Sequence, residues 1–176
     1  LMSILKVNSI QNSTGIATAL TIDSNGRFVA PNQPVCDAYG SGTCTVTDGT
    51  SQNISITTFN INRGFSISAS KLIIPKSGIY SMTTGYISQI TGSGYSIRAI
   101  AIRPRINGTA YVGPDARWNS APSAGFSNTH FEIRHDWIYN FSENDQVDLQ
   151  VTIYHNKGSA LSETFYAYIQ MYAYLG

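Results

Sequence analysis

The sequence predicts an all-β protein of the two-sheet sandwich class. No window places apolar residues at positions i, i+3, i+4 and i+7 through three turns, so the periodicity of an amphipathic helix is absent. Short runs rich in β-branched and aromatic residues recur instead, separated by clusters of Gly, Pro, Asn and Ser. Seven or eight such strands without a helix are typical of a β-sandwich, and 176 residues suffice for one well-buried domain.

The N-terminal segment is predicted to form an arm. A short strand is expected at residues 5–10, and residues 19–23 and 27–29 bracket a Ser-Asn-Gly turn signal. An isolated hairpin of this size is only marginally stable, so we expect the arm to lie on another chain. The apolar residues expected to anchor it there are Leu5, Val7, Ile10, Ile22 and Phe28.

A proline-containing linker is predicted to separate this arm from the rest of the chain. Prolines cannot continue a strand ladder, and residues 30–34 contain two of them. We therefore expect an arm and linker over residues 1–34 and a head over residues 35–176.

Two cysteines, Cys36 and Cys44, flank the turn-rich segment Tyr39–Gly42. A hairpin centred on Gly40 would place the two thiols opposite each other, which leaves a disulfide open. The alternative is a pair of small buried side chains, because a chain without an export signal is made in a reducing compartment.

The head is predicted to consist of strands joined by tight turns. The clearest alternation runs over residues 146–154, where Val147, Leu149, Val151 and Ile153 share one face. Asn107-Gly108 favours a two-residue hairpin turn of type I′. Further strands are expected at residues 51–61, 71–74, 79–90, 95–106, 129–139 and 164–175.

The last strand presents a row of large polar-tipped side chains on one face. Its odd positions are apolar and fit a sandwich interior, whereas its even positions are Tyr166, Tyr168, Gln170, Tyr172 and Tyr174. Four tyrosines exposed along one strand would form a larger apolar patch than monomeric proteins normally carry. We therefore predict that these residues form an interface between copies of the chain. The alternative is that the arm or the loop at residues 113–128 covers them.

Composition excludes several partners. Charged residues make up 12% of the chain and the net charge is +1, so no basic cluster exists to neutralise a nucleic-acid backbone. No apolar run approaches the ~20 residues that a spanning helix needs, and the N-terminus is too polar for a signal peptide. We expect neither nucleic-acid binding nor membrane insertion.

Signatures of catalysis and of metal or cofactor binding are weak. His130 and His135 are five residues apart on a predicted strand and so face opposite sides, and His155 ends another strand. The segment Asp23–Gly26 faintly resembles a calcium loop but lacks the downstream glutamate, so a hairpin turn is the better interpretation. No Gly-x-Ser-x-Gly motif occurs. We predict a protein that is not an enzyme and holds no metal or cofactor.

Two weaker binding hypotheses concern the middle of the chain. Arg98, Arg103 and Arg105, with Asp115 nearby, suggest ion pairs between subunits or a small anion site, although exposed solvated charges are the simpler explanation. Aromatic residues in a loop on a rigid sandwich can bind a sugar or a neighbouring protein. The candidate ligand loop contains Tyr111, Arg117 and Trp118.

Several segments, in order, resemble the C1q/TNF-like domain family. The most specific is residues 72–80, Leu-Ile-Ile-Pro-Lys-Ser-Gly-Ile-Tyr, and the resemblance covers roughly residues 35–176. The arm resembles leaders that precede such domains in structural proteins of bacteriophages, notably cyanophages. The other matching segments are Val35–Tyr39, Thr45-Val46, Thr58–Asn60, Phe141–Val151 and Phe165–Ile169.

The resemblance implies a ten-stranded jelly roll that assembles as a homotrimer, with the sheet of the final strand facing the threefold axis. It further implies a non-enzymatic protein of the virion surface, made in the host cytoplasm. Because only about thirty residues precede the head, too few for a fibre shaft at ~3.3 Å per residue, we expect a capsid decoration or cement protein. Its arm would add strands to the major capsid protein or to another virion protein.

Two alternatives stay open. One is a tail-fibre or tail-tip protein that recognises a host surface glycan through the loop at residues 113–128. The other is a soluble C1q-like lectin or signalling ligand, which the missing signal sequence disfavours.

Overall fold

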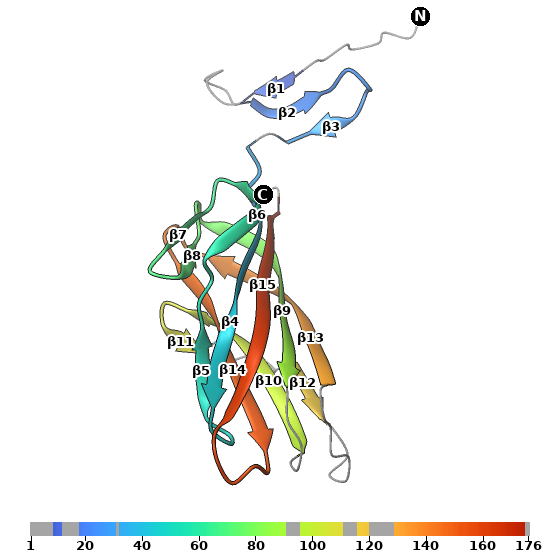
Figure 1. Cartoon of the computed structure of the whole chain (residues 1–176). Helices are drawn as coiled ribbons and strands as arrows, with labels where there is room; N and C mark the ends of the chain where they lie inside the picture. Colours follow the sequence, from blue (N-terminus) through green and yellow to red (C-terminus); the bar gives the residue numbers. More distant parts are fainter. Residues whose placement is uncertain are drawn as a thin grey trace, which may run out of the picture. The chain divides into compact units, whose positions relative to one another are not determined.

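The computed structural model describes residues 9–11, 18–30, 32–90, 96–110, 116–119 and 129–174. It divides the chain into an N-terminal unit up to Gln33 and a larger unit, the head, over Pro34–Tyr174. Both are built from strands, as Figure 1 shows. The described residues contain no helix long and apolar enough to cross a membrane.

The N-terminal unit contains a three-stranded antiparallel sheet. Its strands are β1 (Ser9–Gln11), β2 (Thr18–Ile22) and β3 (Phe28–Val29), in the order β1-β2-β3. The turn predicted between β2 and β3 is confirmed by their pairing. Of the strand expected at residues 5–10, the structure describes only the end, in β1.

Asp23 organises that turn. Its carboxylate accepts hydrogen bonds from the backbone amides of Asn25 and Arg27, each at 2.9 Å, and pairs with the Arg27 guanidinium at 2.7 Å. These donors, above all Arg27, hold the pKa of Asp23 below its usual value. The hairpin interpretation of this segment is therefore confirmed.

The first sheet of the head has five strands in the order β13-β9-β15-β4-β6. Residue parity along each strand divides its side chains between the sandwich interior and an outer face. Figure 1 shows the four long strands side by side along the head. The bounds are β4 (Val35–Val46), β6 (Thr58–Arg63), β9 (Gly78–Ile90), β13 (Thr129–Phe141) and β15 (Leu161–Ala173).

The second sheet has seven strands. Its main path is β11-β10-β14-β8-β7, with β12 beside β10 and β5 beside β14. The alternation predicted for residues 146–154 is confirmed by β14, whose odd residues from 147 to 155 are buried. The bounds are β5 (Ser51–Ile54), β7 (Ser66–Ser68), β8 (Lys71–Ile73), β10 (Ile97–Ile106), β11 (Thr109–Ala110), β12 (Ala116–Asn119) and β14 (Gln146–His155).

The hairpin expected around Gly40 is wrong, because β4 runs through it unbroken. Gly40 serves close packing instead: a Cβ there would collide with the backbone carbonyl of Ser55. Cys36 and Cys44 lie on the same strand, about 26 Å apart at ~3.3 Å per residue, too far for a disulfide. Both thiols are free, with Cys36 buried and Cys44 half-buried.

One strand that the sequence predicted is two strands in the structure. Residues 51–61 form β5 in the second sheet and, after a crossing segment, β6 in the first. The predicted Asn107-Gly108 turn is confirmed by φ angles of 53° and 80° and by the pairing of Ile106 with Thr109. The count of seven or eight strands was low because this crossing and the short strands β7, β11 and β12 carry little periodic signal.

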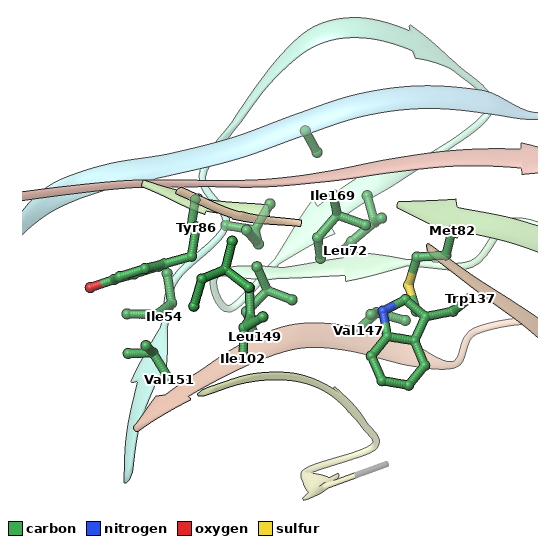
Figure 2. Packing of buried hydrophobic residues seen from close by; sticks show 14 of the residues in the cluster. Ile54, Leu72, Met82, Tyr86, Ile102, Trp137, Val147, Leu149, Val151 and Ile169 are labelled. Atoms are coloured by element: carbon green, nitrogen blue, oxygen red, sulfur yellow. The ribbon is translucent and has the colours of Figure 1, made fainter. Parts of the chain in front are cut away.

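The core lies between the two sheets. Ile169 and Tyr86 from the five-stranded sheet meet Leu149 and Ile102 from the other, as Figure 2 shows. Burying such side chains contributes roughly 1.5–3 kcal/mol each. Apolar packing of the two sheets therefore holds the head together.

A buried polar cluster interrupts this core. The Glu163 carboxylate accepts hydrogen bonds from the hydroxyls of Tyr86, at 2.5 Å, and Ser88, and from the Cys44 thiol at 3.1 Å. Glu163 itself is 2% exposed. Burial and the neighbouring carboxylate raise the pKa of Cys44 to about 12, which keeps this thiol protonated.

Candidate interaction surface

The outer face of the five-stranded sheet is the candidate site, and β15 crosses its middle. Ala167, Ile169 and Met171 on β15 are fully buried, whereas Tyr166, Tyr168, Gln170 and Tyr172 alternate with them and point outward. The predicted division of this strand into a core face and a tyrosine-bearing face is therefore present. We call the outer surface of this sheet the tyrosine face. Strand pairing and alternation place these side chains on it: Tyr39, Tyr166, Tyr168, Gln170, Tyr172, Thr83, Ile79, Ile61, Asp136 and Ile138.

Three tyrosines form an aromatic cluster near the middle of this face. Tyr39 on β4 lies opposite Tyr168 in the ladder and stacks on Tyr166, with ring centroids 5.2 Å apart and planes 28° apart. Tyr166 and Tyr168 are 6.2 Å apart. These offset contacts favour one arrangement of the rings, so part of each ring is covered within the chain.

Gly85 on β9 makes room for this cluster. It is the ladder partner of Tyr168, and a Cβ at residue 85 would lie well under 3.0 Å from the tip of the Tyr168 ring. The ring therefore lies across the backbone of β9 instead of standing away from it. The role of Gly85 could not be predicted from the sequence, because a glycine in a strand reveals its role only once the neighbouring strand is known.

Several further apolar side chains of the tyrosine face are exposed. In the described part of the head, five large apolar side chains are between 51% and 67% exposed. Four lie on this face by parity and pairing, and the fifth directly follows β15, where its amide bonds to the carbonyl of the residue at 79, 2.8 Å away. They are Ile61, Ile79, Ile138, Tyr172 and Tyr174.

Carboxylates surround the aromatic cluster. Asp136 on β13 accepts a hydrogen bond from Thr83 at 2.5 Å and lies 3.7 Å from the Arg134 guanidinium. Partial burial raises the pKa of Tyr168, and Glu132 raises it further, while Arg134 opposes this shift. The face thus combines an apolar and aromatic area with a charged margin.

The outer face of the second sheet is different. Its strands present Arg105 and Asp148, which pair at 13% and 7% side-chain exposure, and polar side chains such as Thr152, which bonds to Ser51 at 2.7 Å. None of the exposed large apolar side chains of the described head lies there. The two outer faces of the sandwich are therefore chemically distinct.

Two of the three arginines singled out in the sequence form ion pairs within the chain. Arg98 pairs with Asp48 at 2.7 Å and Arg105 with Asp148, so both guanidinium groups have carboxylate partners within the chain. An anion site or an ion pair between subunits at these arginines stays a prediction. Arg103 lies between them on β10, and Asp115 is outside the described residues.

Three comparisons place this geometry among known proteins. No family model matches the sequence, and no curated protein does. Among solved structures, the TNF protein Eiger from S. frugiperda aligns with a TM-score of 0.56 at 6% identity, covering 81% of this chain and 94% of that one. The globular domain of zebrafish complement C1qA aligns with a TM-score of 0.55 at 9% identity, covering 81% and 98%.

The head has the C1q/TNF-like jelly-roll fold. The jelly-roll fold that the resemblance of residues 35–176 implied is therefore confirmed, with twelve strands in the two sheets of the described head where ten were expected. At 6–9% sequence identity, the similarity to these structures shows the fold alone. The bacteriophage origin and the homotrimer stay predictions.

The other predicted binding residues lie outside this face or beyond the described residues. In the arm, Ile22 is exposed, Ile10 and Phe28 belong to β1 and β3, and Leu5 and Val7 are not described. In the candidate ligand loop, Tyr111 is not described. Arg117 and Trp118 belong to β12, where they pair with Ala101 and Ile100 of the C1q/TNF-like head.

The histidines lie in different environments. His135 on β13 packs on Trp137 with ring centroids 4.3 Å apart, and His155 at the end of β14 is buried with Nε2 3.4 Å from the Val46 carbonyl. His130 lies on β13, five residues before His135 as expected. Among the described residues, no group of three or more His, Cys, Asp or Glu side chains is placed to hold a metal ion.

Proposed function

We propose that the chain is a non-enzymatic protein that assembles as a homotrimer through its tyrosine face. The observation that carries this proposal is the gathering of exposed apolar side chains on that face and at its end, while the opposite sheet is polar. Exposed apolar side chains gathered on one face are typical of protein interaction sites. The tyrosines suit such a surface because each combines a large apolar body with a hydroxyl that stays wet at the margin.

The choice of three copies rests on the fold. The C1q/TNF-like resemblance implies a homotrimer in which the sheet of the final strand faces the axis, and the tyrosine face belongs to that sheet. Tyr168 lies at its centre, between Tyr39 and Gly85 on the neighbouring strands. Burial of this centre would shield the most aromatic part of the head from water.

We further propose that the trimer is displayed on the surface of a bacteriophage, as a capsid decoration or cement protein held by the N-terminal unit. The resemblance of the arm to phage leaders supports this placement. β1 and β3 are the edges of the described three-stranded sheet, and edge strands can accept a strand from another protein, here the major capsid protein. In this role the protein would stabilise the capsid by adding buried area across its subunits.

A tail-tip protein that reads a host glycan is the second candidate. Trp118 and Arg117 lie on β12, which pairs with β10 in the second sheet and so belongs to a different sheet from the tyrosine face. An aromatic or a guanidinium group on such a strand suits a sugar ligand.

Charge placed on each face tests the assembly. Ile138→Asp, Tyr168→Asp or Tyr172→Asp would bury an unpaired carboxylate in the interface, which should release monomers or insoluble chains. Asn53→Asp adds the same charge to exposed β5 on the opposite sheet and should leave the trimer intact. If all four variants keep the mass of the unmodified protein in light scattering, the tyrosine face is not the interface.

Copy number tests the placement. Quantified protein from purified particles should contain hundreds of copies for a decoration protein and a few tens or fewer for a tail protein. Particles without the protein should stay infectious but burst at a lower temperature if it is a cement. Binding of the isolated head to a glycan array would favour the tail tip.

A further inference from the structure

The structure holds two Asn-Gly pairs in tight turns whose asparagine side chains are held very differently. Asn25-Gly26 lies in the turn between β2 and β3, and Asn107-Gly108 in the turn between β10 and β11. We propose that Asn25 is a site of spontaneous modification, at which the side-chain amide is lost to give aspartate or isoaspartate. Asn107, in the same dipeptide, is protected.

The chemistry needs only water. The backbone nitrogen of Gly26 attacks Cγ of Asn25, the new N–Cγ bond closes a five-membered succinimide, and the Cγ–Nδ2 bond breaks. Nδ2 leaves as ammonia, taking the proton that the Gly26 nitrogen gives up. Water then opens the ring: cleavage at Cγ yields aspartate, and cleavage at the α-carbonyl yields isoaspartate. Glycine favours the first step because it has no side chain to shield its nitrogen.

At Asn25 the reacting atoms are accessible. Asn25 and Gly26 are exposed, and a Cβ at Gly26 would meet no atom within 4 Å. Within the described residues the Asn25 side chain has no hydrogen-bond partner; only its backbone amide is bound, to Asp23 at 2.9 Å. One hydrogen bond restrains the attacking nitrogen, from Gly26 to the Asp23 carbonyl at 2.9 Å.

At Asn107 the side chain is clamped from both ends. Its Nδ2 donates to the Asp145 carboxylate at 2.7 Å, and its Oδ1 accepts from the Gln146 amide at 2.9 Å. Its own backbone amide donates to the Gln146 carbonyl at 2.9 Å. Gly108 is as open as Gly26, so space does not distinguish the pairs. For Cγ to turn toward the Gly108 nitrogen, both side-chain bonds must break.

Modification at Asn25 would dismantle its turn. Isoaspartate carries the main chain through the former side chain and so adds an atom between residues 25 and 26. The added atom changes the spacing over which Asp23 bonds to the amide and carbonyl of Arg27. The β2–β3 pairing at Thr21 and Ile22 would then lose the turn that sets its register. In the proposed function this unit is the anchor, so aged copies would detach; the modification itself does not depend on that function.

Peptide mapping of the full chain tests the proposal. The protein is incubated at pH 7.4 and pH 9, digested, and analysed by mass spectrometry with fragmentation that separates aspartate from isoaspartate. Asn25 should convert faster than Asn107 by about tenfold or more, the retardation expected when two hydrogen bonds must break before reaction. In denaturant the two rates should converge, because the clamp is gone.

Two variants sharpen the test. Asn25→Gln would need a six-membered ring and should abolish conversion at residue 25. Asp145→Ala removes one side of the clamp and should accelerate conversion at Asn107. The rate of conversion at Asn25 should stay the same. Equal rates at the two asparagines in the folded protein, or faster conversion at Asn107, would overturn the proposal. If Asn25 converts but the protein is a monomer or is absent from purified particles, only the proposed function is refuted.

Discussion

The ring of Tyr168 on β15 lies over Gly85 on β9, its partner in the ladder, where any Cβ would overlap it. This pair sets the shape of the tyrosine face. Because residue 85 is glycine, the central ring lies along the sheet, flanked by Tyr39 on the other side. The centre of the face is thereby flattened, as close approach of another sheet requires.

Replacing Gly85 should therefore act through Tyr168. Gly85→Ala is expected to push the ring outward, cost about 1 kcal/mol of unfolding free energy, and weaken self-association. In a Tyr168→Ala background the same substitution should be neutral or stabilising, because alanine suits a strand better than glycine does. A double-mutant cycle by chemical denaturation measures this reversal. Additive effects would show that the two residues are not coupled.

The thiols should be unreactive in the folded protein. Burial raises the pKa of Cys36 to about 12, and burial together with Glu163 raises that of Cys44 to about 12. The reactive thiolate is therefore scarce at pH 8. A thiol reagent should label neither residue quickly under native conditions and both in denaturant without a reductant. Labelling that requires prior reduction would contradict the free-thiol assignment.

The turn between β7 and β8 carries avoidable strain. Ala69 and Ser70 occupy its two central positions with φ angles of 49° and 61°, values that favour Asn and Gly. The double substitution Ala69→Asn, Ser70→Gly should raise the unfolding free energy by about 1 kcal/mol. The reverse change at a matching turn, Gly108→Ser, should lower it. Thermal and urea denaturation of both variants would show whether these opposite signs hold.

The turn at Asp23 should open in acid. Its pKa is lowered in the folded state from the usual 3.8, so the carboxylate stabilises the turn fully above that value. This contribution is lost as the pH falls through the folded-state pKa, below 3.8. Protection of the Asn25 and Arg27 amides, measured as the exchange rate relative to the intrinsic rate at each pH, should fall over that range. In Asp23→Asn this protection should already be low at neutral pH. Protection that does not change with acid in the unmodified chain would refute this role.

Periodic segments were predictable from sequence, whereas features set by neighbouring strands were not. The alternation of Val147 to Ile153 needs only one buried face, and β14 has it. Gly40 looked like a turn residue because local pattern cannot show that Ser55 packs against its Cα. Ile138 was not singled out for the same reason: its place on the tyrosine face follows from its pairing with Ser81 on β9.

The burial of polar side chains could not be predicted from the sequence either. Glu163 lies in a strand whose odd positions are otherwise apolar, and nothing local marks it as the acceptor for Tyr86 and Ser88. Those donors come from a strand more than seventy residues away in sequence. Long-range pairing, and not propensity, decides where such a carboxylate is tolerated.

The molar mass of the purified chain in solution, measured by light scattering during gel filtration, tests the central claim most directly. Burial of the tyrosine face predicts three times the 19.1 kDa of one chain, lowered by Tyr172→Asp and unchanged by Asn53→Asp. A folded species of 19.1 kDa with Tyr168 and Tyr172 accessible to solvent would contradict it.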